Sequence, residues 1–196
     1  MNSFKSYFTG LRSLALLLIS VLMLQGCAVA LVGAGAVGVK AATDRRSLGT
    51  QLDDQTIEYR AQRAISEGSA FDNARVLAVA YNDRVLLVGQ APSDEIRRQA
   101  ELAVREAVGE RQVHNEVRIR SRVGFTTKTE DTWITSKVKT ALLSDERVDG
   151  SQIKVITENG EVFLMGIVDA EEGRIATDIA RNTAGVVRVV TAFIKP

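Results

Sequence analysis

The stretch Ile153-Lys-Val-Ile-Thr-Glu-Asn-Gly-Glu-Val-Phe-Leu-Met-Gly166 decides the fold, because it reads as two strands joined by a tight turn. Residues 153–157 alternate in polarity, which is typical of a strand with one buried face. Asn159-Gly160 is a strong hairpin signal, since both residues tolerate positive φ. Asn82-Asp83 and the strand Arg84-Val-Leu-Leu-Val-Gly89 repeat the turn and the returning strand earlier in the chain.

The repeat extends well beyond the hairpin. Asp54 aligns with Asp131 at an offset of 77, and the offset becomes 76 after the loop 90–92, where an insertion is cheap. The matched pairs include Ile57 and Ile134, Ala64 and Ala141, Val85 and Val162, Leu87 and Leu164, Gly89 and Gly166, Ser93 and Asp169, Ala100 and Ala176, Gly109 and Gly185, and Val113 and Val189. Each copy is long enough to bury its own small core, so we interpret the repeat as a gene duplication rather than a solenoid.

Each copy is expected to run helix, strand, strand, helix, strand. The first helix of the second copy places Ile134, Val138 and Leu142 on one face. The expected helix caps are Asp131, Ser93 and Asp169, the expected helix ends are Gly109 and Gly185, and the expected last strands are 113–119 and 187–194. The sequence therefore predicts an α+β protein of two tandem αββαβ domains, each a three-stranded mixed sheet with two helices on one face.

The N-terminal region predicts export. Lys5 and Arg12 precede an apolar run that is too short for a comfortable membrane span and ends at Leu24-Gln-Gly-Cys27. This ending resembles the bacterial lipobox, which implies a covalent lipid on Cys27, the only cysteine, and cleavage before it. The alternative is an incidental thiol at the end of a signal anchor. By the same resemblance, Ala28 rather than Asp implies the outer membrane, facing the periplasm.

The predicted organisation is a signal peptide at 1–26, a lipidated cysteine and small-residue tether at 27–53, a first domain at 54–120, a linker at 121–130 and a second domain at 131–196. Gly33-Ala-Gly-Ala-Val-Gly38, inside the tether, matches the dinucleotide pattern G-x-G-x-x-G. It has no room for the strand that must precede such a loop, so we interpret it as a tether close to the bilayer.

Both copies resemble the BON domain. The resemblance rests on the glycine that closes the second strand, the capped helix after it, and the opening of the last strand, Gly185-Val-Val-Arg-Val189. The first copy departs from the pattern at its last strand, where Gly109-Glu110 replaces Gly-Val. This departure bears on whether the first copy binds a ligand, and not on its fold. A lipobox followed by two such copies resembles the dual BON-domain outer-membrane lipoproteins of Gram-negative bacteria. That resemblance implies phospholipid binding, a role in envelope integrity and envelope stress, and enrichment at division sites.

No catalytic constellation is evident. The single histidine, His114, lies in a predicted strand, and the cysteine is assigned to lipid, so neither a metal cluster nor a Ser-His-Asp triad is expected. The formal net charge of +1 gives no global field that would attract nucleic acid. We therefore expect no enzyme activity, no metal, no nucleic-acid partner and no cofactor other than the covalent lipid on Cys27.

Trp133 is the candidate for function. At 100° per residue it points away from the core face of its helix and lies near Lys137 and Thr140, while its counterpart in the first copy is Thr56. Lys139 adds positive potential, and Lys128 in the predicted linker joins it. Tryptophan beside lysine suits a bilayer interface, where the ring lies among glycerol groups and the ammonium reaches phosphate. The alternatives are packing of Trp133 against the first domain and contact with a protein partner.

The leading hypothesis is a non-enzymatic outer-membrane lipoprotein whose second domain binds anionic phospholipid such as phosphatidylglycerol or cardiolipin. The competing hypothesis is an adaptor that docks on outer-membrane protein assembly machinery or on peptidoglycan, with Trp133 as its anchor.

We expect Cys27→Ala to leave the leader uncut and the protein without lipid, because no other thiol in the chain accepts a diacylglyceryl group. Mass spectrometry of the mature N-terminus measures both. An unmodified thiol at Cys27 in the natural protein, or cleavage elsewhere, would contradict the lipoprotein interpretation.

Overall fold

The prediction of two tandem αββαβ domains is confirmed by a computed structural model, which describes residues 44–196. The predicted signal peptide, Cys27 and the tether up to Thr43 lie outside the described residues. The elements of the first domain are α2 (Leu48–Ser66), η1 (Ser69–Phe71), β1 (Arg75–Tyr81), β2 (Arg84–Ala91), α3 (Asp94–Val108), β3 (Gln112–Asn115) and β4 (Arg118–Ile119). Those of the second are α4 (Phe125–Ser144), η2 (Gly150–Gln152), β5 (Lys154–Glu158), β6 (Glu161–Ile167), α5 (Ala170–Arg181) and β7 (Arg188–Ile194).

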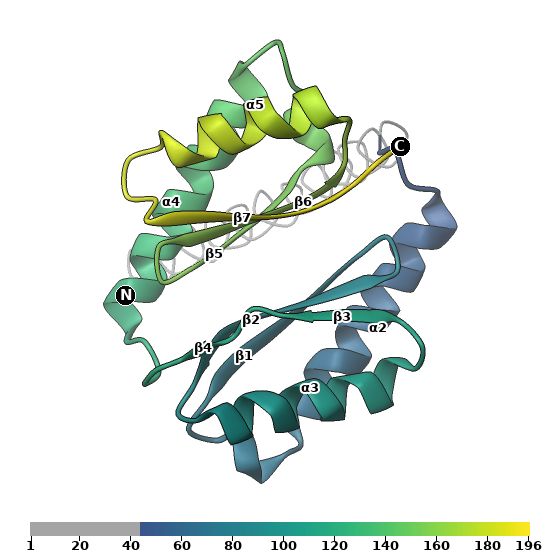
Figure 1. The fold of residues 1–196 in the computed structure, drawn as a ribbon, viewed down its shortest axis with the longest axis vertical. Coiled ribbons are helices and arrows are strands. Elements are labelled where there is room, and N and C mark those ends of the chain that lie inside the picture. The colour runs from purple at the N-terminus through teal and green to yellow at the C-terminus, as the bar shows by residue number, and fades with distance from the viewer. Residues whose placement is uncertain (1–43) are drawn as a thin grey trace, which may run out of the picture. The chain divides into compact units, whose positions relative to one another are not determined.

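Both sheets have the same topology. In each, an antiparallel hairpin is followed by a helix that returns the chain to pair in parallel with the second hairpin strand. The orders are β1-β2-β3, with β4 also pairing with β2, and β5-β6-β7. Two helices cover one face of each sheet, α2 and α3 in the first domain and α4 and α5 in the second (Figure 1).

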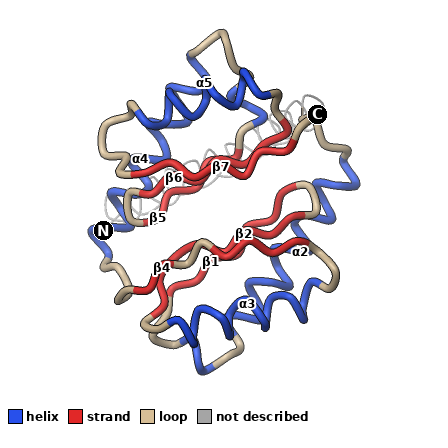
Figure 2. The backbone as a smooth tube through the Cα atoms, in the orientation of Figure 1, coloured by secondary structure: helices blue, strands red, loops and turns tan. Residues whose placement is uncertain are grey.

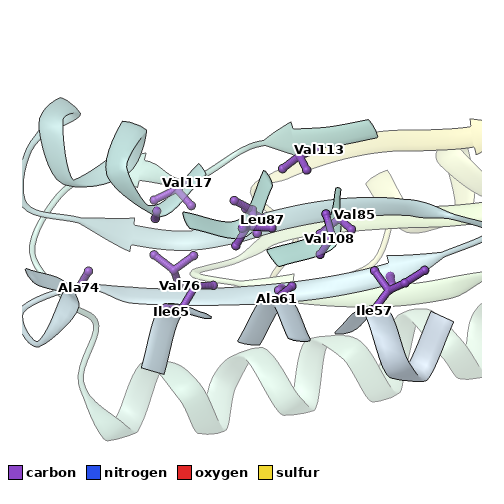
Figure 3. Packing of buried hydrophobic residues seen from close by; sticks show 14 of the residues in the cluster. Ile57, Ala61, Ile65, Ala74, Val76, Val85, Leu87, Val108, Val113 and Val117 are labelled. Atoms are coloured by element: carbon purple, nitrogen blue, oxygen red, sulfur yellow. The ribbon is translucent and has the colours of Figure 1, made fainter. Parts of the chain in front are cut away.

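The core of each domain lies between its helices and its sheet. In the first domain, Ile57, Ala61 and Ile65 follow the helical repeat of α2 and pack towards the strand residues Val76 and Val85 (Figure 3). Ile134, Val138 and Leu142 of α4 form the corresponding core of the second domain. The sequence-predicted helix faces are therefore the buried ones.

A third core joins the two sheets, and the sequence reading of two separately buried copies missed it. Val79, Tyr81, Leu86 and Val88 of the first sheet pack with Phe163 and Met165 of the second, all less than 10% exposed. Figure 2 shows the strands of both sheets lying between the helices. The strands are apolar on both faces because one face meets helices and the other meets the partner sheet.

Polar contacts fix this junction between the sheets. The Tyr81 hydroxyl donates to the Gln152 carbonyl at 3.1 Å, and its burial raises the pKa of the Tyr81 phenol. Glu158 is 4% exposed and accepts from Arg75 Nε and Gln90 Nε2, each at 2.9 Å. A buried carboxylate with two donors is satisfied, so the contact sets the register of one sheet on the other.

The segment before α2 is tied to the second domain. The Arg45 amide donates to Gln152 Oε1 at 2.8 Å, and its guanidinium donates to the Ile167 carbonyl at 2.6 Å and to Glu172 at 2.7 Å. The Glu172 hydrogen bond raises the pKa of Arg45. Arg46 instead bonds Asp54 at 2.7 Å, in the first domain. Residues 45–46 therefore bridge the two domains.

The expectation that Asp131 is a helix N-cap is wrong. α4 begins at Phe125, and the buried Asp131 carboxylate accepts the Asn159 amide at 2.7 Å and the Gly160 amide at 2.8 Å. Asp54 does the same for the Asn82 and Asp83 amides at 2.7 and 2.9 Å. The duplicated aspartate thus clamps the hairpin turn of its own domain, where the residues at positive φ leave two amides without a strand partner.

Four boundaries also differ from the sequence reading. The predicted tether 27–53 overlaps α2, which begins at Leu48 with Ser47 as its N-cap, so the first domain starts before residue 54. The predicted linker 121–130 is helical from Phe125 onward, so the connection between the domains is only 120–124. α5 ends at Arg181 rather than at Gly185, which lies in the following loop, whereas Gly109 caps α3 as predicted. The last strand of the first domain is split, because the Asn115 side chain accepts the Val117 amide at 3.1 Å and interrupts the ladder. No helix in residues 44–196 is long and apolar enough to cross a membrane.

We expect Asp131→Ala to lower the free energy of unfolding by about 1–3 kcal/mol, because two turn amides lose their acceptor. Urea denaturation measures the change. Glu130→Ala, an exposed neighbour on the same helix, is the control and should change stability by less than about 0.5 kcal/mol. Equal stability of the two variants would show that the clamp is unimportant.

Candidate functional site

α4 presents two different faces. Ile134, Val138 and Leu142 are buried against the sheet. On the opposite side Phe125, Trp133 and Leu143 are exposed by 84%, 66% and 65%. Large apolar side chains that are exposed together on one helix are unusual and indicate a contact surface.

The three exposed side chains lie within one 80° sector of the helix, here called the α4 apolar stripe. With Trp133 at 0° and 100° per residue, Phe125 and Leu143 both fall at −80°. They share a direction because a spacing of 18 residues makes five turns, and the rise of about 1.5 Å per residue separates them by about 27 Å. The core face centres near 125°, so the stripe points away from the domain.

Three hydroxyl residues of this face are hydrogen-bonded within the helix. Thr129, Thr132 and Ser136 donate to the carbonyls of Phe125, Lys128 and Thr132 at 3.2, 2.9 and 2.9 Å. Their donors are therefore used within the helix. A shallow groove of about 360 Å³ runs between Phe125 and Trp133 over these residues.

Lysines flank the stripe. Lys128 and Lys139 fall at −140° and −120° on one side, and Lys137 falls at 40° on the other. No carboxylate of α4 lies between these limits, since Glu130 falls at 60° and Asp131 at 160°. The face is therefore apolar along its centre and cationic along its edges.

The four sequence-predicted residues have different surroundings. Trp133, Lys139 and Thr140 are exposed, so Trp133 does not pack against the first domain as the alternative required. Lys137 is only half-exposed, and its ammonium donates to the Ala184 carbonyl in the loop after α5. Lys137 thus ties this loop to α4. Lys128 is half-exposed and Lys139 is exposed, and neither ammonium has an ion pair or hydrogen bond within residues 44–196, so we call them the free lysines of the face.

Phe125 and Leu143 were missed as members of this face. Phe125 was assigned to the linker because Asp131 was read as the start of the helix. A longer predicted helix, from Phe125 to Leu143, would have placed both residues on the same side as Trp133, because 18 residues make five full turns.

The first domain carries a related but weaker face. Leu48, Leu52 and Tyr59 of α2 are 62–65% exposed and align with Phe125, Thr129 and Ser136. Thr56 replaces Trp133, and Gln51 and Gln62 replace Lys128 and Lys139. The first domain therefore keeps an apolar line but lacks the tryptophan and both free lysines.

Within residues 44–196 no group of three or more His, Cys, Asp or Glu side chains is arranged to hold a metal ion. His114 lies in β3 with an exposed side chain.

The sequence model of the BON domain matches residues 53–121 and 130–194, which are the two copies of the repeat. The chain belongs to the BON-domain family. It is 40% identical over 184 residues to "Outer membrane lipoprotein DolP" of Haemophilus influenzae, covering 93% of this chain and 95% of that protein. It is also 39% identical to the "21 kDa hemolysin" of Actinobacillus pleuropneumoniae, over 75% of this chain and 76% of the relative.

Among solved structures, CdsD, a structural protein of the type III secretion system of Chlamydia trachomatis, matches with 16% identity and a TM-score of 0.30. That match covers 73% of this chain and 63% of CdsD.

We expect Trp133→Glu to change the free energy of unfolding by less than about 0.5 kcal/mol, because the side chain is exposed and its counterpart Thr56 is polar. Leu142→Ala, on the buried face of the same helix, is the contrasting variant and should cost about 2–5 kcal/mol. Chemical denaturation measures both, and a large loss in Trp133→Glu would mean that the ring is buried in the folded protein.

Proposed function

We propose that this protein is a non-enzymatic outer-membrane lipoprotein whose second domain binds anionic phospholipid through the outward face of α4. The observation that carries the proposal is the α4 apolar stripe with its flanking lysines. The stripe includes the exposed Trp133, a residue type that concentrates at the bilayer interface.

The arrangement suits a helix that lies in the plane of the membrane surface. Apolar side chains along the centre enter the boundary between headgroups and acyl chains, while lysines at the edges remain with the phosphates. Full burial of a side chain such as Phe125 or Leu143 contributes about 1.5–3 kcal/mol. Each lysine close to an anionic surface contributes about 1 kcal/mol. Lys128 and Lys139 therefore favour phosphatidylglycerol and cardiolipin over neutral lipids.

The relatives support the location. The Haemophilus protein is named an outer-membrane lipoprotein, and the similarity spans nearly the whole of both chains. Lipidation of Cys27 would hold the second domain near the bilayer and raise the effective concentration of its apolar face there. Envelope integrity, and enrichment at division sites, are part of the proposal through the family resemblance.

Flotation of an acyl-free form of the chain with lipid vesicles tests the proposal. We expect binding to vesicles that contain phosphatidylglycerol or cardiolipin and little binding to phosphatidylcholine vesicles. Trp133→Glu should weaken binding by about 1–3 kcal/mol, from lost apolar burial and added repulsion. Lys128→Gln with Lys139→Gln should remove the preference for anionic lipid.

Tyr59→Glu is the matched control. Tyr59 is as exposed as Trp133 and lies on the corresponding helix of the first domain, which lacks the free lysines. It should leave vesicle binding unchanged. Binding that is insensitive to Trp133→Glu, or equally sensitive to both substitutions, would refute the assignment to α4.

A further inference from the structure

The hairpin turn of the second domain carries a chemically labile pair of residues. Asn159 is the only asparagine in the sequence that is followed by glycine, since the others are followed by serine, alanine, aspartate, glutamate or threonine. The main-chain nitrogen of the next residue attacks an asparagine side chain, and glycine leaves that nitrogen unhindered because it has no Cβ. Asn159-Gly160 is therefore the position in the sequence that is most open to this reaction.

The reaction needs no co-reactant other than water. The Gly160 nitrogen loses its proton and bonds to Cγ of the Asn159 side chain. The bond between Cγ and the side-chain nitrogen breaks, and that nitrogen takes up the proton and leaves as ammonia, so that a cyclic succinimide remains. Water then opens the ring at either of its carbonyls. One opening gives aspartate, and the other gives isoaspartate, in which the main chain runs through Cγ.

The folded structure restrains the attacking nitrogen. The Gly160 amide donates to Asp131 Oδ1 at 2.8 Å, and the Asn159 amide donates to Oδ2 of the same carboxylate at 2.7 Å. Asp131 is 6% exposed and Gly160 is buried. Loss of the Gly160 proton would place a negative nitrogen against a buried negative carboxylate, which is unfavourable. The Gly160 carbonyl is held as well, because it accepts the Val187 amide at 2.9 Å.

The turn also requires the glycine that makes it labile. Gly160 has a φ of 75°, in the left-handed region that favours glycine. A Cβ at this position would lie 2.8 Å from Val187 Cγ2. The first domain differs, because its turn is Asn82-Asp83 and the Asp83 side chain hinders the attack, although Asp54 clamps both amides in the same way. The labile pair is therefore confined to the second domain.

We propose that Asn159 is a site of spontaneous deamidation whose rate is set by the Asp131 clamp. While the clamp is closed, the side chain remains an amide. Local opening of the turn frees the Gly160 nitrogen for attack, and such openings occur without global unfolding. Asn159 is half-exposed, so water reaches the ring. The proposal does not depend on membrane binding by α4.

Deamidation would change the hairpin covalently. Aspartate at position 159 adds a negative charge to a residue whose amide already binds Asp131. Isoaspartate adds a carbon atom to the main chain of the tight turn. The strands β5 and β6 pair up to Glu158 and Glu161, directly beside the turn, so the added atom disturbs the pairing of these residues. We expect both products to lower the stability of the second domain.

The test follows residue 159 by peptide mapping with mass spectrometry, in the full-length lipoprotein in non-ionic detergent at constant pH and temperature. We expect conversion at least about tenfold slower than in a synthetic peptide of residues 154–164, which lacks Asp131. Asp131→Asn keeps the shape of the side chain but removes its charge and one acceptor oxygen, so it should accelerate conversion about tenfold. Mapping is needed because Asp149 also precedes glycine and isomerises through the same kind of ring.

Asp54→Asn is the matched control. It removes the equivalent clamp from the first domain and leaves the Asp131 contacts in place. It should change the rate at Asn159 by less than about twofold, since the two turns are separate sites. Hydrogen exchange at the Gly160 amide should become faster in Asp131→Asn and stay unchanged in Asp54→Asn.

Leu142→Ala separates local opening from global unfolding. It destabilises the core of the second domain but keeps the clamp, so it should convert Asn159 within about threefold of the natural rate. This comparison and the peptide comparison decide the question even if Asp131→Asn does not fold.

The proposal fails if Asn159 converts as fast in the natural protein as in the peptide. It also fails if Leu142→Ala accelerates conversion more than Asp131→Asn does, because global unfolding would then set the rate. Slower conversion in a folded Asp131→Asn protein would overturn it too, since the carboxylate would then assist the loss of the Gly160 proton.

Discussion

Each sheet of this protein has one face covered by its own helices, and the other face must be hidden from water. The two domains cover these faces by packing against each other: Phe163 and Met165 of the second sheet contact Val79, Tyr81, Leu86 and Val88 of the first. The short connection at 120–124 and the bridge made by Arg45 are consistent with that requirement, since both keep the sheets together. The outward direction of α4 and of its apolar stripe follows, because a helix whose sheet is fixed can only face solvent on its far side.

Much of the fold could be predicted because the duplication supplies an internal check. Each copy independently predicts the hairpin, the second helix and the buried helix faces. In both copies the spacing of the apolar residues agrees with the helix or strand that the structure contains. The sheet-to-sheet core was missed because continuous apolar strands such as Val85–Val88 are compatible with burial on either one face or two. Asp131 was misread for a related reason: an aspartate near the start of a helix is usually a cap, and its turn amides lie 28 residues away.

The candidate site was predicted in part. Trp133 was identified because its duplicate is polar, an argument that needs only alignment of the two copies. Lys137 was placed correctly on the helix, but its contact with Ala184 depends on where the loop after α5 returns.

The Arg45 bridge has a mechanical consequence. A chain that is anchored upstream and enters the folded region at residue 44 delivers any pull first to the Arg45 contacts with Ile167 and Glu172. The load is therefore shared by the second domain before it reaches α2, and the first helix is not peeled from its sheet one turn at a time. Several contacts that bear a force at the same time resist it better than contacts that break one after another. The Arg45 hydrogen bonds therefore protect α2 from a force applied through the upstream chain.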